Sequence, residues 1–210
     1  MRKITITEAL NELKLYDSKI NKAISSAAFI GAKKKTNDKI GVVSTDKFVS
    51  NAKAALQSVQ DLIRNRNILK AAIVESNART MLEVAGKKMT VAEAIERKTS
   101  IDYDKELLLA MKSQYAAATT TVRKENEKVD KKVDELISTL IGKDTAKKLD
   151  EADQNAVEAP YRAKNEFELV DPLGLLDVIT VMETEIDEFE STVDGRLTLS
   201  NATTFIELDF

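Results

Sequence analysis

Residues 76–84 read Ser-Asn-Ala-Arg-Thr-Met-Leu-Glu-Val, and residues 200–208 read Ser-Asn-Ala-Thr-Thr-Phe-Ile-Glu-Leu. The two copies are identical at five positions and exchange one apolar side chain for another at three more. Each copy follows a long stretch of helical periodicity and then alternates apolar and polar side chains, as a short strand does. The repeat therefore predicts two matching helix-to-strand junctions in one fold.

The asparagines of this repeated segment, Asn77 and Asn201, are predicted to make the change of direction at each junction. Asparagine tolerates the left-handed backbone conformation and hydrogen-bonds its own backbone. The residues that follow favour extended geometry because they include threonine and alternate in polarity. We therefore expect residues 80–84 and 204–208 to pair with each other and to form a small β element at one end of a helical bundle.

A ligand-binding site is the alternative interpretation of the same repeat. In that case the pocket would be lined by the polar residues that recur in both copies, Asn77, Thr80, Asn201 and Thr204. Turn formation and strand pairing explain the repeat without a ligand, so the pocket is kept as the second hypothesis.

Composition favours a mainly α fold. Charged residues make up 32% of the 210-residue chain and aromatic residues only 5%, with six glycines and two prolines, a profile typical of long helices and coiled coils. This length suits one good hydrophobic core. We expect a single helical domain over residues 1–210, built as an elongated antiparallel helical bundle or coiled coil.

Apolar periodicity predicts the helices. They cover residues 5–28, 45–74, 90–141, 144–158 and 176–195, and the third is either one long helix or a helix pair. The inward face of the second helix is predicted to carry Phe48, Ala52, Leu56, Val59 and Ile63. Asp17 and Asn126 interrupt otherwise apolar helix faces and are interpreted as polar positions that set the register between helices.

Local signals mark several element boundaries. Thr5 with Glu8, and Thr90 with Glu93, have the spacing of a capping box. Residues 85–88 are predicted as a turn, and residues 167–170 as a brief strand. A lysine-rich stretch with flanking glycines makes residues 31–44 a predicted mobile loop.

The residue inventory argues against an enzyme. The chain has neither cysteine nor histidine, which removes disulfides, thiolate catalysis, the usual general base near neutral pH and the commonest zinc ligands. The N-terminus lacks the apolar core of a secretion signal, and no apolar run is long enough to span a membrane. We expect a protein made in the cytoplasm, without cofactor or metal, that binds neither nucleic acid nor membranes.

Three charged clusters have a functional and a simpler interpretation. The lysines at 33, 34, 35 and 39 could attract phosphate, but a solvated loop explains them as well. Arg64 and Arg66 could hold an anion, although a surface ion pair with Asp61 is simpler. Several acidic residues in 183–190 share one helix face, yet no loop ligands accompany them, so we predict no metal site.

Four segments resemble the septicolysin-like family of small helical bacterial and phage proteins. They are residues 76–80, the turn at Gly86, residues 89–98 and residues 201–204, so the resemblance covers the central third and the end of the chain. The family usually has an aromatic residue after the terminal asparagine, where this chain has Ala202. The resemblance implies a helical protein of a kind common in bacteriophage genomes, and no catalytic or membrane motif comes with it.

The helical pattern and the residue inventory predict a non-enzymatic structural or assembly protein that acts through protein–protein contacts, and the resemblance implies that it is a bacteriophage virion component. Its partners would be proteins, in a homo-oligomer or a larger assembly, and it would be made in the cytoplasm before incorporation in a phage particle. The second hypothesis is a binding module that captures a small ligand or inhibits a host protein. A membrane-active lysin and an enzyme rank below both.

Overall fold

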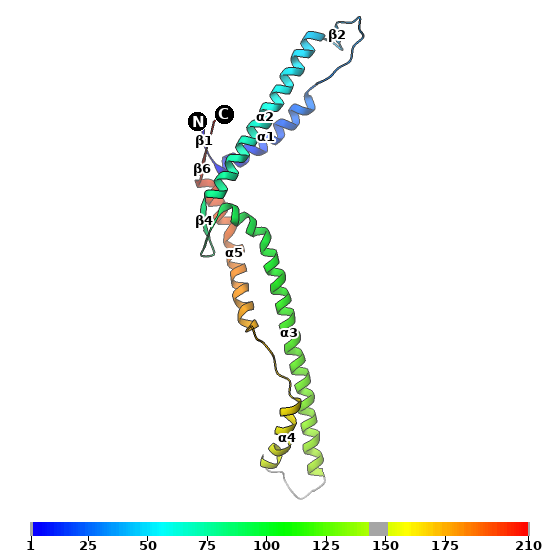
Figure 1. The fold of residues 1–210 in the computed structure, drawn as a ribbon, viewed down its shortest axis with the longest axis vertical. Coiled ribbons are helices and arrows are strands. Elements are labelled where there is room, and N and C mark those ends of the chain that lie inside the picture. The colour runs from blue at the N-terminus through cyan, green and yellow to red at the C-terminus, as the bar shows by residue number, and fades with distance from the viewer. Residues whose placement is uncertain (1, 143–150, 210) are drawn as a thin grey trace. The chain divides into compact units, whose positions relative to one another are not determined.

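The computed structural model describes residues 2–142 and 151–209. Within these ranges the chain is mainly α-helical, and its strands form three small antiparallel pairs (Figure 1). The mainly α fold with a small β component is therefore confirmed. The elements are β1 (Arg2–Thr5), α1 (Ile6–Ser26), β2 (Lys39–Ile40), β3 (Val43–Ser44), α2 (Thr45–Arg79), β4 (Met81–Val84), β5 (Lys87–Thr90), α3 (Val91–Gly142), α4 (Glu151–Asn165), α5 (Leu175–Thr203) and β6 (Phe205–Leu208).

Residue contacts divide the chain into two compact units. One unit contains the residues up to Thr99 together with those from Glu188 onward, and the other contains Ser100–Asp187. The helices α3 and α5 each contribute residues to both units. The predicted single domain over residues 1–210 is not decided by this division and stays a prediction.

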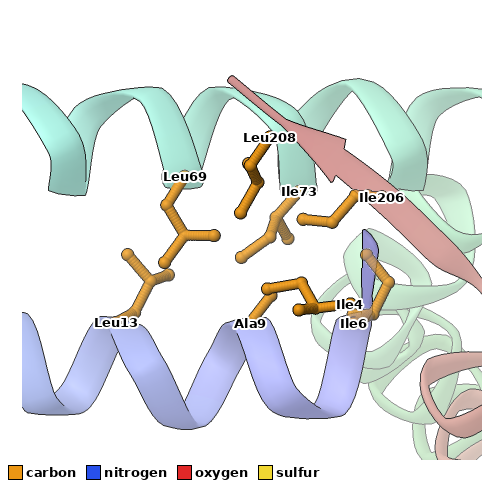
Figure 2. Close-up of a cluster of buried hydrophobic side chains, with 8 residues drawn as sticks. All are labelled: Ile4, Ile6, Ala9, Leu13, Leu69, Ile73, Ile206 and Leu208. Carbon is orange, nitrogen blue, oxygen red and sulfur yellow. The ribbon is translucent and has the colours of Figure 1, made fainter. Parts of the chain in front are cut away.

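In the first unit, α1 and α2 pack against each other as an antiparallel helical hairpin (Figure 1). Their buried side chains meet those of β1 and β6 in one hydrophobic cluster (Figure 2). Its members are Ile4, Ile6, Ala9, Leu13, Leu69, Ile73, Ile206 and Leu208. Because β1, α1, α2 and β6 all contribute to this cluster, it holds the strand pair β1–β6 against the helical hairpin.

The helix α3 is continuous from Val91 to Gly142, so the predicted alternative of a helix pair does not apply. Asn126 of α3 donates a hydrogen bond to the Phe167 carbonyl at 2.9 Å and accepts one from the Phe167 amide at 2.7 Å. Arg162 of α4 also forms an ion pair with Asp130 of α3 at 2.7 Å. The polar interruption at Asn126 therefore holds the segment between α4 and α5 against α3.

The predicted pairing of residues 80–84 with 204–208 is wrong. Both segments form strands, but β4 pairs with β5 and β6 pairs with β1, each in antiparallel register. A two-residue loop, Ala85-Gly86, connects β4 to β5, and both loop residues have positive φ as a type I′ turn requires. This turn makes β5 the nearest partner for β4, which leaves β6 to pair with β1.

The predicted left-handed turns at Asn77 and Asn201 are also wrong. Both residues lie inside helices, and among the described non-glycine residues only Ala85 has positive φ. The amide of Thr80 still donates to the Ser76 carbonyl at 2.8 Å, so helical hydrogen bonding runs through the asparagine. The direction changes at Thr80, whose φ of −73° and ψ of 120° are those of extended backbone.

Two further predicted helix ends lie too early. The helix α4 continues through Pro160 to Asn165, and α5 continues through Gly195 to Thr203. Proline removes one helical hydrogen bond, but ion pairs of Arg162 with Glu158 and Asp130 hold the turns on either side of it. The cost of a helical glycine, about 1 kcal/mol, is smaller than the gain from burying Phe189 and Val193 on the preceding turns.

Two predicted loop and strand segments also differ in the structure. Residues 167–170 form no strand, because the backbone of Phe167 pairs with the side chain of Asn126 and not with another strand. The predicted loop 31–44 contains the short hairpin β2–β3, and its mobility stays a prediction. The predicted start of the fourth helix, at residue 144, lies outside the described residues.

Candidate functional site at the two helix–strand junctions

The repeated segment builds two junctions with the same hydrogen bonds. At the first, α2 ends, β4 pairs with β5 and α3 begins, and the Val91 amide donates to the Thr80 carbonyl at 2.9 Å. At the second, α5 ends, β6 pairs with β1 and α1 begins, and the Ile6 amide donates to the Thr204 carbonyl at 3.0 Å. In each junction, one backbone hydrogen bond joins the two strands' neighbouring residues. The acceptor is the residue just before one strand, and the donor is the first residue of the helix that follows the partner strand.

Both predicted capping boxes are present, one at each junction. The Glu8 carboxylate accepts from the Thr5 amide at 2.8 Å, and the Glu8 amide donates to the Thr5 hydroxyl at 3.2 Å. At the other junction, the Glu93 carboxylate accepts from the Thr90 amide at 2.6 Å, and the Glu93 amide donates to the Thr90 hydroxyl at 3.1 Å. Amides at the starts of α1 and α3 that have no partner within the helix are satisfied in this way.

These hydrogen bonds lower the pKa of both glutamates. The backbone amide of Thr5, followed by its hydroxyl, lowers the pKa of Glu8, and Thr90 does the same for Glu93. Each carboxylate therefore releases its proton more readily in the folded than in the unfolded chain. Such a group stabilises the fold above its unfolded pKa, about 4.3, and this contribution is lost as the pH falls through the lower folded pKa.

We expect the double substitution Glu8→Gln and Glu93→Gln to flatten the acid limb of the stability curve. Glutamine keeps the capping geometry but has no carboxyl group to titrate. Urea unfolding measured between about pH 3 and pH 6 should show a smaller loss of stability on acidification than in the parent protein. The control variant carries Glu106→Gln and Glu168→Gln at exposed positions, and equal slopes for both variants would contradict the prediction.

The strands that pair with the two copies of segment 76–84 and 200–208 also resemble each other in sequence. Residues 3–10 read Lys-Ile-Thr-Ile-Thr-Glu-Ala-Leu, and residues 88–95 read Lys-Met-Thr-Val-Ala-Glu-Ala-Ile. The first segment runs from β1 into α1, and the second runs from β5 into α3. This shared pattern is the signal from which sequence reasoning could have found the pairing of β6 with β1 and of β4 with β5.

The cross-strand pairs of the two junctions correspond position by position. Lys3 lies opposite Glu207 in one junction, and Lys88 lies opposite Glu83 in the other. On the other face, each junction has one apolar pair, such as Ile4 opposite Ile206 in the β1–β6 pair. The charged pair on one face and the apolar pair on the other favour this register, because a slip by one residue would turn the apolar side chains outward.

A pocket of about 360 Å³ lies in the first unit, between the end of α2 and β6. Thr80 and Thr204 both line it, so the structure brings together two of the four predicted ligand-binding residues. Asn77 and Asn201 are not among the lining residues. The rest of the lining combines charged, polar and apolar groups, namely Ala72, Glu75, Ser76, Arg79, Phe205, Ile206 and Glu207.

Two of the charged side chains that line the pocket pair with each other. Arg79 forms an ion pair with Glu75 at 2.9 Å, and both side chains are largely exposed. An exposed pair of this kind contributes little to stability, so a ligand carrying a carboxylate or phosphate could exchange with Glu75 at small cost. The pocket therefore offers space and one guanidinium group to a small polar ligand.

The other predicted clusters form ordinary surface interactions. Arg64 pairs with Asp61 at 2.6 Å, as the simpler interpretation predicted, and Arg66 pairs with Asp17 of α1 at 2.6 Å. Glu183 pairs with Lys112 of α3. Within residues 2–142 and 151–209, no group of three potential ligands is arranged to hold a metal ion.

Comparison with models of protein families, with curated proteins and with solved structures finds no match for this chain. Among the helices in the described ranges, none combines the length and the apolar character needed to cross a membrane.

Proposed function

We propose that this chain is a non-enzymatic structural or assembly protein that acts through protein–protein contacts. The observation that carries the proposal is an exposed apolar stripe on α2, formed by Val49, Leu56, Ile63 and Val74. The spacings of seven, seven and eleven residues keep these side chains on nearly one line along the helix. Each is between 39% and 54% exposed, so the stripe is only partly covered by the rest of the chain.

The α2 stripe includes residues that were predicted to face inward. Of the predicted inward face, Val59 is buried against the rest of the first unit, whereas Leu56 and Ile63 remain exposed. Ile63 also lines an open groove of about 550 Å³ together with Gln60, Arg64, Asn67, Ile68 and Ala71. Full burial of a Leu or Ile side chain is worth about 1.5–3 kcal/mol, so a partner that covers this groove gains free energy that the isolated chain does not.

Charged substitutions in the α2 stripe are expected to weaken association. Replacing Leu56 and Ile63 by glutamate removes two apolar contacts and adds two charges that a partner would have to desolvate. Analytical ultracentrifugation should show association at least about tenfold weaker than for the parent, the equivalent of about 1.4 kcal/mol. The control, Ser58→Arg, changes an exposed residue on the opposite side of the same helix and should leave association unchanged.

The proposal fails if two results occur together. In the first, the parent protein sediments only as a monomer at micromolar concentration; in the second, it retains no partner when passed over purified phage particles. Placement in a bacteriophage particle is part of the proposal and is supported by the resemblance to the septicolysin-like family alone. Immunogold labelling of virions tests that placement separately.

A binding module is the second candidate function, because the junction pocket joins Thr80 and Thr204 with Arg79. Native mass spectrometry of the protein purified from its own cells would reveal a co-purifying ligand. Replacing Arg79 by alanine should release it, whereas an apo mass for the parent would count against this function.

A further inference from the structure

The chain contains two successive repeats that begin and end alike, because each opens with a strand that leads into a helix and closes with a helix that leads into a strand. The first repeat spans 2–84, from β1 to β4, and the second spans 87–208, from β5 to β6. The strand pair β4–β5 joins the first repeat to the second through the Ala85-Gly86 turn. The pair β6–β1 joins the second repeat to the first with the same register, but no turn connects its strands.

We propose that copies of this chain link to one another through this open joint, with β6 of one copy pairing with β1 of the next. The inference rests on the proposed function and names the partner as a second copy of the chain. Every hydrogen bond and apolar contact of the joint is retained in the linked form, because only the identity of the chain that supplies β6 changes.

The receiving surface lies entirely within the first repeat. It consists of the apolar residues Ile4, Ile6, Ala9, Leu13, Leu69 and Ile73, which we call the acceptor cluster. Ile206 and Leu208 of β6 point into the acceptor cluster and complete it, as Figure 2 shows. A copy whose β6 has left therefore exposes an apolar surface shaped for the same two side chains, and any β6 can cover it.

Polar contacts at the joint select β6 over other apolar strands. The Lys3 ammonium lies 5.1 Å from the centre of the Phe205 ring, and Lys3 is opposite Glu207 in the strand register. The Ile6 amide also requires the Thr204 carbonyl. A foreign strand would have to match these groups as well as the two apolar side chains, so a second copy is the partner that fits.

The linked form is head-to-tail, because each copy offers one donor strand and one acceptor cluster. Such an interface closes into a ring if the rotation between copies allows it, and otherwise grows into an open chain. The balance between closed monomers and linked copies depends on concentration, since the closed form competes through the effective concentration of its own β6. High local concentration in an assembling particle favours linkage.

The experiment uses single-cysteine variants, because the chain has no cysteine of its own. One tagged copy carries Lys3→Cys and a differently tagged copy carries Glu207→Cys, and both are expressed in the same cell so that the chains meet as they fold. Residues directly opposite in an antiparallel pair lie about 4.5–5.5 Å apart at Cα, within the range that a disulfide spans. After oxidation, non-reducing gels show how much mixed dimer forms.

The matched control is the equivalent pair in the connected junction, with Glu83→Cys in one copy and Lys88→Cys in the other. All four positions are exposed, so chance collisions should be similar in both experiments. We expect several-fold more mixed dimer from the 3 and 207 pair than from the 83 and 88 pair. Equal amounts overturn the proposal.

The two proposals fail in different ways. Oligomers in the ultracentrifuge without an excess of the disulfide between residues 3 and 207 would leave the assembly function standing and refute strand exchange. Absence of both oligomers and phage partners would refute the assembly function itself.

Discussion

Replacing Leu69 by alanine is expected to lower the free energy of unfolding by about 2–5 kcal/mol. The Leu69 side chain is 0% exposed and lies in the hydrophobic cluster between α1 and α2 (Figure 2). Alanine leaves a cavity there, because the surrounding side chains come from four different elements and cannot all move inward. Urea unfolding followed by circular dichroism measures the loss.

The matched control is Leu56→Ala on the same helix. Leu56 is 48% exposed, so the same chemical change removes little buried area and should alter stability by about 0.5 kcal/mol or less. A similar loss for both variants would show that the cluster does not carry the stability of the first unit. A larger effect of Leu56→Ala at high protein concentration alone would instead reflect self-association through the α2 stripe.

Local signals in the sequence predicted local structure well. Both capping boxes form as the Thr-x-x-Glu spacing predicts, because the residues involved lie within one helical turn. The start of α2 at Thr45 is likewise fixed by neighbouring residues. The turn predicted at residues 85–88 is confirmed at Ala85 and Gly86, whereas Lys87 and Lys88 already belong to β5. The mainly α fold follows from these elements and from the apolar periodicity.

Pairing between distant strands could not be predicted from the repeated segment alone. Its two copies were expected to pair with each other. Instead, the copy at 200–208 pairs with segment 3–10, and the copy at 76–84 pairs with segment 88–95. An alternating strand of four residues contains no information about its partner beyond apolar and polar faces. The two junctions can be predicted only when both pairs of similar segments are recognised, 76–84 with 200–208 and 3–10 with 88–95.

Hydrogen bonding in the folded chain also overrode local propensity. Asn77 was expected to turn the chain, yet it lies in α2, because neighbouring residues continue the helical hydrogen bonds to Thr80. Residues 167–170 were expected to form a strand, but the backbone of Phe167 bonds to the side chain of Asn126, 41 residues away. The candidate pocket could not be predicted from local sequence either, because Thr80 and Thr204 come together only where α2 packs against β6.

Replacing Ile206 by aspartate is expected to destabilise the first unit by about 3–5 kcal/mol, the penalty for leaving an uncompensated charge in a buried position. Ile206 is 6% exposed, and its side chain completes the acceptor cluster. Release of β6 is one way for the chain to return that charge to water. Hydrogen exchange should then show lost protection in β1 as well as β6, because the two strands satisfy each other's backbone groups.

The substitution Phe205→Asp at the neighbouring position tests whether the loss in stability comes from burying the charge or from any substitution in β6. Phe205 is 54% exposed and lies on the opposite face of β6, where aspartate stays in water. The substitution removes the cation–π contact between the Lys3 ammonium and the Phe205 ring, which is worth about 0.5–1 kcal/mol at an exposed site. An ion pair between Lys3 and the new aspartate offsets part of this loss. Urea unfolding should therefore rank Ile206→Asp far below Phe205→Asp in stability. Equal losses would mean that β6 contributes through its backbone alone, and that the acceptor cluster does not depend on the side chains that fill it.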